Sequence, residues 1–142
     1  MTDLLDINVW LALTDENHTH HSRAAEYRQN EAQERIAFCR TTMLGYLRLS
    51  THPQVLSRPL TVQEAWAAYH SYREQPYVCF LSDLDAADVD FKIFTLQESW
   101  SHRFWTDAYL AGLAKRSDAR LVSFDNDFNR FMSLKFLQLY TD

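Results

Sequence analysis

The 142-residue sequence is poor in glycine and proline, with two and three residues respectively. Without tracts of these residues or blocks of like charge, no stretch resembles a flexible linker or a low-complexity segment. Hydrophobic residues make up 46% of the chain, which at this length is enough to bury the core of one domain. We therefore expect residues 1–142 to form a single domain.

Long apolar runs and basic leader patterns are also missing. No run approaches the roughly 18 apolar residues that cross a bilayer, and Asp3 and Asp6 interrupt any signal-peptide pattern at the N-terminus. The two cysteines, Cys39 and Cys79, lie in apolar segments, where a buried and reduced thiol is the ordinary state. These features predict a cytoplasmic protein.

The chain lacks net positive charge, since its formal charge at pH 7 is -5. As a whole it would repel nucleic acid, so a nucleic-acid substrate would need a local basic patch. Such a patch could be formed by Arg40, Arg48, Lys115, Arg116, Arg120 and Arg130. The alternative is that these residues are separate, solvated surface charges.

Short apolar runs bounded by polar residues predict strands, and helical patterns lie between them. The strands are expected at about 3–7, 35–39, 77–81, 119–124 and 136–140, and the helices at about 20–33, 41–51, 61–74, 86–98 and 103–117. This alternation predicts an α/β fold with a mostly parallel sheet between layers of helices. In such sheets, ligands bind at the carboxyl ends of the strands.

Carboxylates fall where this rule would place a site. Asp6 closes the first strand inside the apolar segment LLDINVWLAL, and Asp125 and Asp127 follow the strand RLVSF. Asp107 shares a helical face with apolar residues at i+3, i+4 and i+7, which directs it toward the sheet. Converging carboxylates favour a divalent cation, and oxygen ligands suit Mg²⁺ or Mn²⁺. Phosphodiester hydrolysis is the chemistry that such an ion assists.

Each of these aspartates also has an ordinary structural interpretation. Asp6 could cap a helix that follows the first strand, and Asp in a turn or at a helix start commonly bonds to the backbone. Agreement between three separate segments is what favours a site. His18 and His21, spaced i and i+3, could bind a transition metal, but no further Cys or His stands nearby in sequence to complete such a site.

Three segments in this order resemble a known family. LLDINVWLAL, TDAYLAGLA at 106–114 and LVSFDNDF at 121–128 look like motifs of the PIN-domain ribonucleases, specifically the VapC-type toxins of bacterial toxin-antitoxin pairs. The resemblance implies a PIN-like three-layer α/β/α fold and an endoribonuclease that depends on Mg²⁺ or Mn²⁺. It also implies an RNA substrate, a homodimer and silencing by a cognate antitoxin protein.

The resemblance assigns roles to individual residues. The matching metal-binding positions are Asp6, Asp107 and Asp125, and Asp127 is close enough to share in catalysis. Asn8 and Ser123 occupy positions that would form hydrogen bonds beside these carboxylates.

One position departs from the family pattern. PIN domains commonly carry a Glu on the helix after the second strand, whereas this chain has Gly45 there, within TTMLGYLRL. With fewer carboxylates, one bound metal ion is more expected than two. The alternative function is therefore a catalytically weakened PIN-like module that binds RNA or a protein. An unrelated phosphotransfer domain would need a glycine-rich phosphate loop, and this chain has none.

Overall fold

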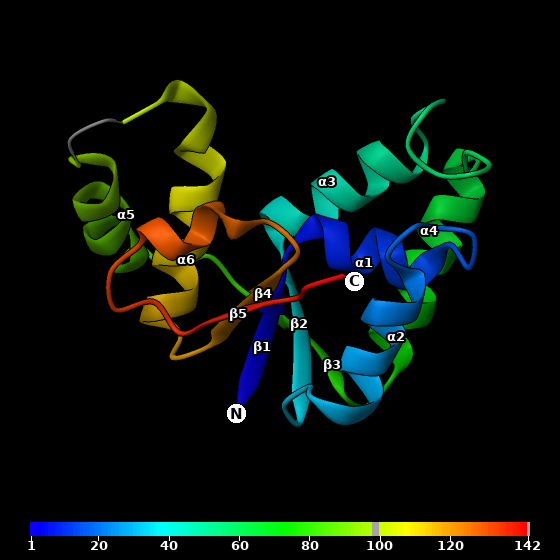
Figure 1. Cartoon of the computed structure of the whole chain (residues 1–142), viewed down its shortest axis with the longest axis horizontal. Coiled ribbons are helices and arrows are strands. Elements are labelled where there is room, and N and C mark those ends of the chain that lie inside the picture. Colours follow the sequence, from blue (N-terminus) through cyan, green and yellow to red (C-terminus); the bar gives the residue numbers. More distant parts are fainter. Residues whose placement is uncertain (98–99, 142) are drawn as a thin grey trace.

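The computed structural model describes residues 1–97 and 100–141. Its elements in chain order are β1 (Thr2–Leu5), α1 (Ile7–Thr14), α2 (His21–Asn30), β2 (Arg35–Cys39), α3 (Arg40–Ser50), α4 (Val62–Glu74), β3 (Val78–Leu81), α5 (Ala87–Thr95), η1 (His102–Phe104), α6 (Trp105–Arg116), β4 (Arg120–Ser123), η2 (Asn126–Arg130) and β5 (Phe136–Gln138) (Figure 1). None of the helices in the described ranges is long and apolar enough to cross a membrane.

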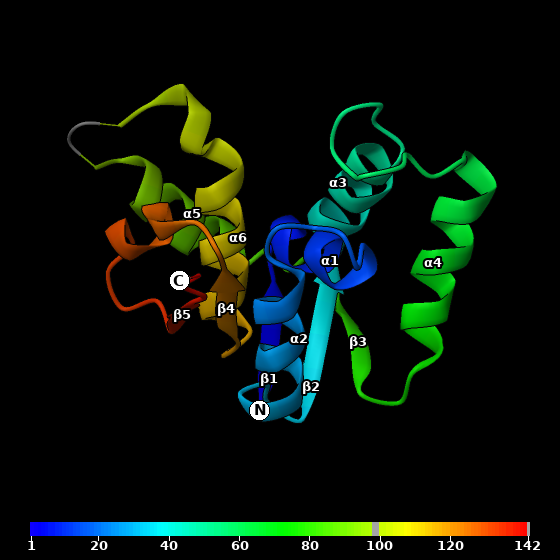
Figure 2. The same cartoon turned by 45° about the vertical axis from the view of Figure 1, so that its right-hand side comes forward.

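The strands form one parallel sheet in the order β3-β2-β1-β4-β5. Helices α5 and α6 cover one face, and α1, α2, α3 and α4 cover the other (Figure 2). Successive strand residues alternate between the two cores: Leu4 packs with α5 and α6, and Leu5 packs with the opposite layer. This arrangement confirms the predicted three-layer α/β/α fold.

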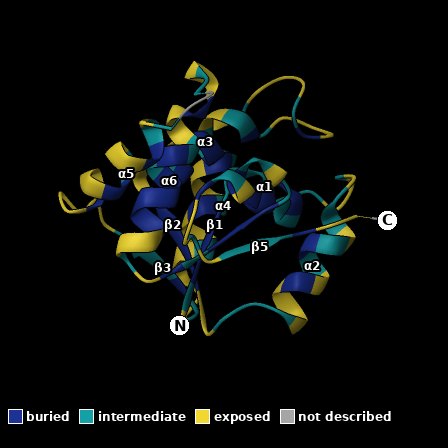
Figure 3. Ribbon diagram, turned by 60° about the vertical axis from the view of Figure 1, so that its left-hand side comes forward, coloured by how far each residue is buried: buried dark blue, intermediate teal, exposed yellow. Residues whose placement is uncertain are grey.

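Helix α6 packs against the sheet with its central residues buried. Figure 3 shows it buried along its middle, while α5 outside it keeps a broad exposed face. Gly112 of α6 allows the close packing, because a Cβ there would lie 2.9 Å from the backbone nitrogen of Phe91 in α5. The predicted apolar face of this helix is confirmed by Leu110, Ala111 and Ala114, all of which are buried.

The predicted strands and helices are all present, but most are shorter than expected. The first strand ends at Leu5 instead of residue 7, because Asp6 caps the helix α1, which was missing from the predicted helices. An apolar run of this length cannot be assigned to strand or helix by periodicity. The helix expected at 86–98 ends at Thr95, and position 98 lies outside the described residues.

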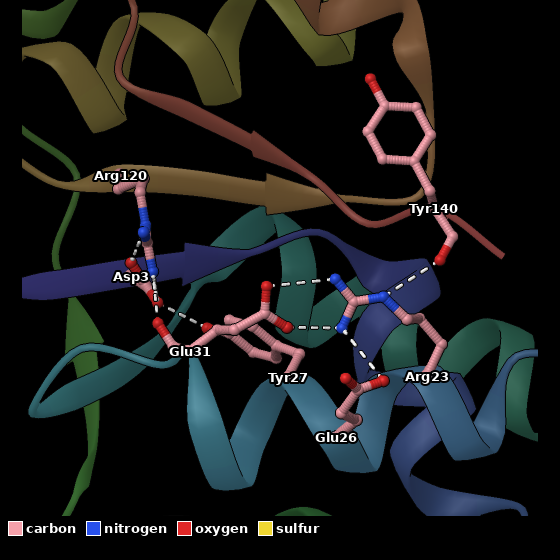
Figure 4. Close-up of polar contacts among 7 residues, drawn as sticks. All are labelled: Asp3, Arg23, Glu26, Tyr27, Glu31, Arg120 and Tyr140. Atoms are coloured by element: carbon pink, nitrogen blue, oxygen red, sulfur yellow. Dashed lines mark hydrogen bonds and ion pairs between the residues drawn. The ribbon is translucent and has the colours of Figure 1, made fainter.

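A buried ion pair joins β1, β4 and α2 at the amino ends of the strands (Figure 4). Asp3 is completely buried and accepts hydrogen bonds from Arg120 Nε and Nη2 at 2.8 and 2.9 Å. It also accepts one from the Tyr27 hydroxyl at 2.6 Å, and Arg120 Nη2 donates to the Glu31 carbonyl at 2.9 Å. These contacts hold β1 beside β4 and so position the strand ends that carry the site.

Candidate functional site

The strand order turns at β1, which pairs with β2 on one side and with β4 on the other. Asp6 immediately follows β1, and Asp125 lies just beyond the end of β4. Because α6 leads into β4 by a short connection, its first turn, with Asp107, lies at the same edge of the sheet. This is the topological position at which parallel sheets bind their ligands.

Three carboxylates converge at this edge. One oxygen from each of Asp107, Asp125 and Asp127 lies within 4.8 Å of the other two, and all three residues are partly buried. The Asp127 N–H donates to Asp125 Oδ1 at 2.9 Å, which fixes these two residues in one turn at the start of η2. All three residues were predicted from the sequence as site residues, but Asp127 was not predicted as a metal ligand.

Asp6 lies beside this group, and both of its oxygens are hydrogen-bonded. Oδ1 accepts the Ile7 N–H at 2.8 Å, and Oδ2 accepts the Ser123 hydroxyl at 2.7 Å. Ser123 Oγ in turn accepts from Asn8 Nδ2 at 3.1 Å and from the Asp125 N–H at 2.9 Å. Burial raises the pKa of Asp6, and its hydrogen bonds oppose that rise. Asp6 therefore combines the helix-capping role with a place in the site, and Ser123 links it to Asp125.

The grouped negative charges raise the pKa of Asp107. Desolvation and repulsion from Asp6, Asp125 and Asp127 raise the pKa of Asp107 to about 7 from an ordinary 3.8, while Arg130 acts in the opposite direction. Repulsion of this kind is relieved by a proton or by a cation. Since the donors are all carboxylate oxygens, the residues fit a hard divalent ion such as Mg²⁺ or Mn²⁺.

Three of the six cations considered for a basic patch form ion pairs away from the carboxylates. Lys115 and Arg116 pair with Asp90 at 3.3 and 3.0 Å, near the far end of α6. Arg120 belongs to the ion pair at the amino ends of the strands. These three residues therefore do not contribute to a basic patch beside the carboxylates, because α6 carries its carboxyl end away from the site and Arg120 lies at the amino ends of the strands. The positive charge of Arg130, by contrast, lowers the pKa of Asp107.

Gly45 lies where α3 meets α1. A Cβ at this position would be 2.1 Å from Ile7 Cδ1, so the glycine allows Ile7 to pack against α3. Both residues line a surface pocket of about 430 Å³, together with Arg48 and Thr106. The pocket is therefore lined by Ile7, which follows Asp6 in the sequence, and by Thr106, which precedes Asp107. A glutamate at Gly45 would first have to displace Ile7.

The two histidines considered as an alternative metal site form hydrogen bonds with backbone groups. His21 Nδ1 forms a hydrogen bond with the Ala12 carbonyl at 2.7 Å, and His18 Nδ1 accepts the His20 N–H at 3.0 Å. Among the residues described, the group of metal-type ligands contains no histidine. His20 stacks on Phe124, next to Asp125, with ring centroids 4.6 Å apart, a contact that no sequence pattern indicated.

Comparison with known proteins agrees with the geometry. The PIN domain family matches residues 4–133. Ribonuclease VapC41 of Mycobacterium tuberculosis is 34% identical over 134 residues, which cover 90% of this chain and 92% of that protein. Ribonuclease VapC38 of the same organism is 35% identical over 122 residues, which cover 86% of this chain and 84% of that protein.

Solved structures share the fold at much lower identity. The complex VapBC2 of Rickettsia felis, bound to a promoter DNA fragment, matches with a TM-score of 0.71 and 12% identity over 99% of this chain and 100% of the other. VapC20 of Mycobacterium tuberculosis, described as a sarcin-ricin loop cleaving toxin, matches with a TM-score of 0.69 and 14% identity over 89% of this chain and 92% of the other. Given the extent of these matches and the curated relatives above 30% identity, this chain belongs to the PIN-domain family, within its group of VapC ribonucleases.

Proposed function

We propose that this protein is the endoribonuclease toxin of a toxin-antitoxin pair and that it depends on Mg²⁺ or Mn²⁺. The observation that carries the proposal is the convergence of Asp107, Asp125 and Asp127 at the carboxyl edge of the sheet, with Asp6 beside them. The names of its relatives, which are ribonucleases, support RNA as the substrate. An RNA substrate also supports action in the cytoplasm.

We assign Asp107, Asp125 and Asp127 to holding the ion, with Asp6 completing the negative site. When bound, the ion would activate water and stabilise the charge that develops on the phosphoryl oxygens. The Ser123 hydroxyl bridges the Asp6 carboxylate and the Asp125 backbone N–H, and Asn8 in turn donates a hydrogen bond to this hydroxyl. These two polar residues therefore orient the site instead of reacting.

Cleavage of total RNA by the purified protein tests this function. We expect discrete fragments with Mg²⁺ or Mn²⁺, none with EDTA, and none from Asp125→Asn, which keeps the turn but removes the charge. The matched control is Asp118→Asn, an exposed acidic position with φ of 54°, a conformation that Asn accepts readily. Intact RNA with wild-type protein under every metal condition would instead favour the non-catalytic binding module.

We further propose that a cognate antitoxin silences the site with a basic side chain. A group of partly buried carboxylates attracts a guanidinium, which can bind two oxygens at once. The structural neighbours in VapBC complexes support an antitoxin partner. If this is correct, added antitoxin should protect RNA, and an antitoxin lacking its basic residues should bind less tightly and protect less.

The homodimer is a separate proposal, supported by the outer face of α5. Val89, Ile93 and Leu96 lie at helical spacing and are 56%, 58% and 74% exposed. An apolar stripe of this kind is typical of a surface that meets a partner. Light scattering should show a dimer for the wild type and a monomer for Ile93→Glu. The control is Val62→Glu, since Val62 of α4 is also an exposed apolar residue, at 68%; a wild-type monomer would contradict the proposal.

A further inference from the structure

Arg130 is a cationic residue close in the chain to Asp125 and Asp127. Its guanidinium carbon lies 3.8 Å from the centre of the Phe104 ring. Phe104 is buried, ends η1 and directly precedes the helix that carries Asp107. Arg130 ends η2, the short helix that Asp125 caps. The stack therefore ties together the two segments that supply the converging carboxylates.

One nitrogen of this guanidinium has no hydrogen-bond partner among the described residues. Arg130 Nη1 is enclosed by protein and has no hydrogen-bond partner within residues 1–97 and 100–141. Leaving a charged N–H buried without an acceptor is unfavourable, so such groups usually have a partner, a bound water or a ligand. Arg130 belongs to the same short helix as Asp127, the helix that Asp125 caps, yet none of the ion pairs found in those ranges includes Arg130.

A ligand that satisfies this group must carry oxygen acceptors and negative charge. A phosphodiester has both, and the planar guanidinium matches its two non-bridging oxygens. Stacking on Phe104 restricts the guanidinium before any ligand arrives, which lowers the entropy lost on binding.

We propose that Arg130 is a catalytic residue that donates hydrogen bonds to a non-bridging oxygen of the scissile phosphodiester. This inference rests on the proposed ribonuclease function, because it requires the phosphate to be held at Asp107, Asp125 and Asp127. During hydrolysis, the water oxygen bonds to phosphorus and releases a proton, and the phosphorus–oxygen bond to the leaving ribose breaks as that oxygen gains a proton. Arg130 stabilises the negative charge on the phosphoryl oxygens while this occurs.

Arg103 offers a matched control for this side chain. Its guanidinium carbon lies 4.7 Å from the centre of the same Phe104 ring, but the side chain is exposed. It lies in η1, whereas Arg130 lies in η2 together with Asp127. Replacing Arg103 therefore removes a cation from the same ring but leaves the short helix after Asp125 unchanged.

The test compares Arg130→Met, Arg130→Lys and Arg103→Met with the wild type on a short RNA spanning a mapped cleavage site. Removing one donor to a developing anion typically lowers kcat about 100-fold. We expect a loss of that order for Arg130→Met, a smaller loss for Arg130→Lys, which keeps the charge without the planar fork, and unchanged kcat for Arg103→Met. Thermal melting confirms that each variant is folded.

A second measurement does not depend on cleavage. Binding of a fluorescein-labelled RNA oligonucleotide is followed by anisotropy in Ca²⁺ over a range of KCl concentrations. Loss of one phosphate contact to single-stranded RNA reduces the slope of log K against log salt by about 0.7, so Arg130→Met should show this reduction relative to the wild type. Arg130→Lys should keep the wild-type slope, because its charge remains.

The outcomes separate this inference from the function on which it rests. If the wild type cleaves RNA in Mg²⁺ or Mn²⁺ but Arg130→Met keeps wild-type kcat and salt slope, the role of Arg130 is refuted and the ribonuclease remains. If Arg130→Met and Arg103→Met lose kcat equally, the effect belongs to the Phe104 ring and the role is also refuted. A wild type that cleaves nothing with either metal overturns both proposals.

Discussion

Replacing Asp107 by Asn should inactivate the enzyme and, in the absence of metal, stabilise the protein at alkaline pH. Desolvation and the charges of Asp6, Asp125 and Asp127 raise the pKa of Asp107 to about 7. Asn has nearly the same shape as Asp but no charge. The substitution therefore removes the repulsion while it keeps the packing of the first turn of α6.

The size of this effect depends on pH. Because the pKa of Asp107 is about 7 when folded and 3.8 as its ordinary value, the folded protein holds this proton more tightly than the unfolded chain does. Wild-type stability therefore falls as pH rises from about 4 to about 7, and the loss is complete above about pH 8. The full difference corresponds to about 4 kcal/mol, but Asp107 is only partly buried, and solvent screening reduces our expectation to about 1 to 2 kcal/mol.

Thermal unfolding in EDTA at pH 5 and pH 8 measures this difference. A domain of this size gains roughly 2 to 4 °C in Tm per kcal/mol, so Asp107→Asn should melt several degrees above the wild type at pH 8 and less far above it at pH 5. Saturating Mg²⁺ or Mn²⁺ should reverse the order, because the ion stabilises the state that binds it. Asp118→Asn, which changes the same charge outside the site, should show no such pH dependence. An Asp107→Asn protein that melts no higher than the wild type at pH 8 would refute the reasoning.

Other substitutions test the parts of the structure that support the site. Arg120→Met should lower the free energy of unfolding by about 3 kcal/mol, because Asp3 would keep a buried charge without its cation; urea unfolding measures this, and adding Asp3→Asn should recover part of the loss. Gly45→Ala should lower Tm, because the new Cβ would meet Ile7 Cδ1 at 2.1 Å, and an unchanged Tm would show that Ile7 moves aside without cost. Ser123→Ala should weaken metal binding about tenfold in calorimetry, since it releases a carboxylate of the site; unchanged affinity would show that the hydroxyl does not orient that carboxylate.

The fold was largely predictable from short-range patterns. Strands β1 and β4 are buried on both faces, as parallel strands usually are, so each appears in the sequence as a short apolar run. The face of α6 was predictable because its apolar residues recur at helical spacing. Helix α1 was not, since its consecutive apolar residues lack the polar face by which a short helix is distinguished from a strand.

The candidate site was also predictable only in part. Asp6, Asp107, Asp125 and Asp127 were named from the sequence, since each follows a strand or lies on an inward-facing position of a helix. Which carboxylates converge could not be predicted, because it depends on how the first turn of α6 approaches the turn after β4. The expectation for Arg120 failed for the same reason, since its neighbours in sequence are near the site while its side chain pairs at the opposite edge.

The sequence by itself determined the parallel α/β order and the identity of the acidic residues, because alternation, helical spacing and strand ends are properties of neighbouring positions. Only the tertiary structure decided that Ile7 occupies the space beside Gly45, that Ser123 links Asp6 to Asp125, and that Arg130 stacks on Phe104. These contacts join segments far apart in the chain, and their geometry follows from the packing of helices against both faces of the sheet.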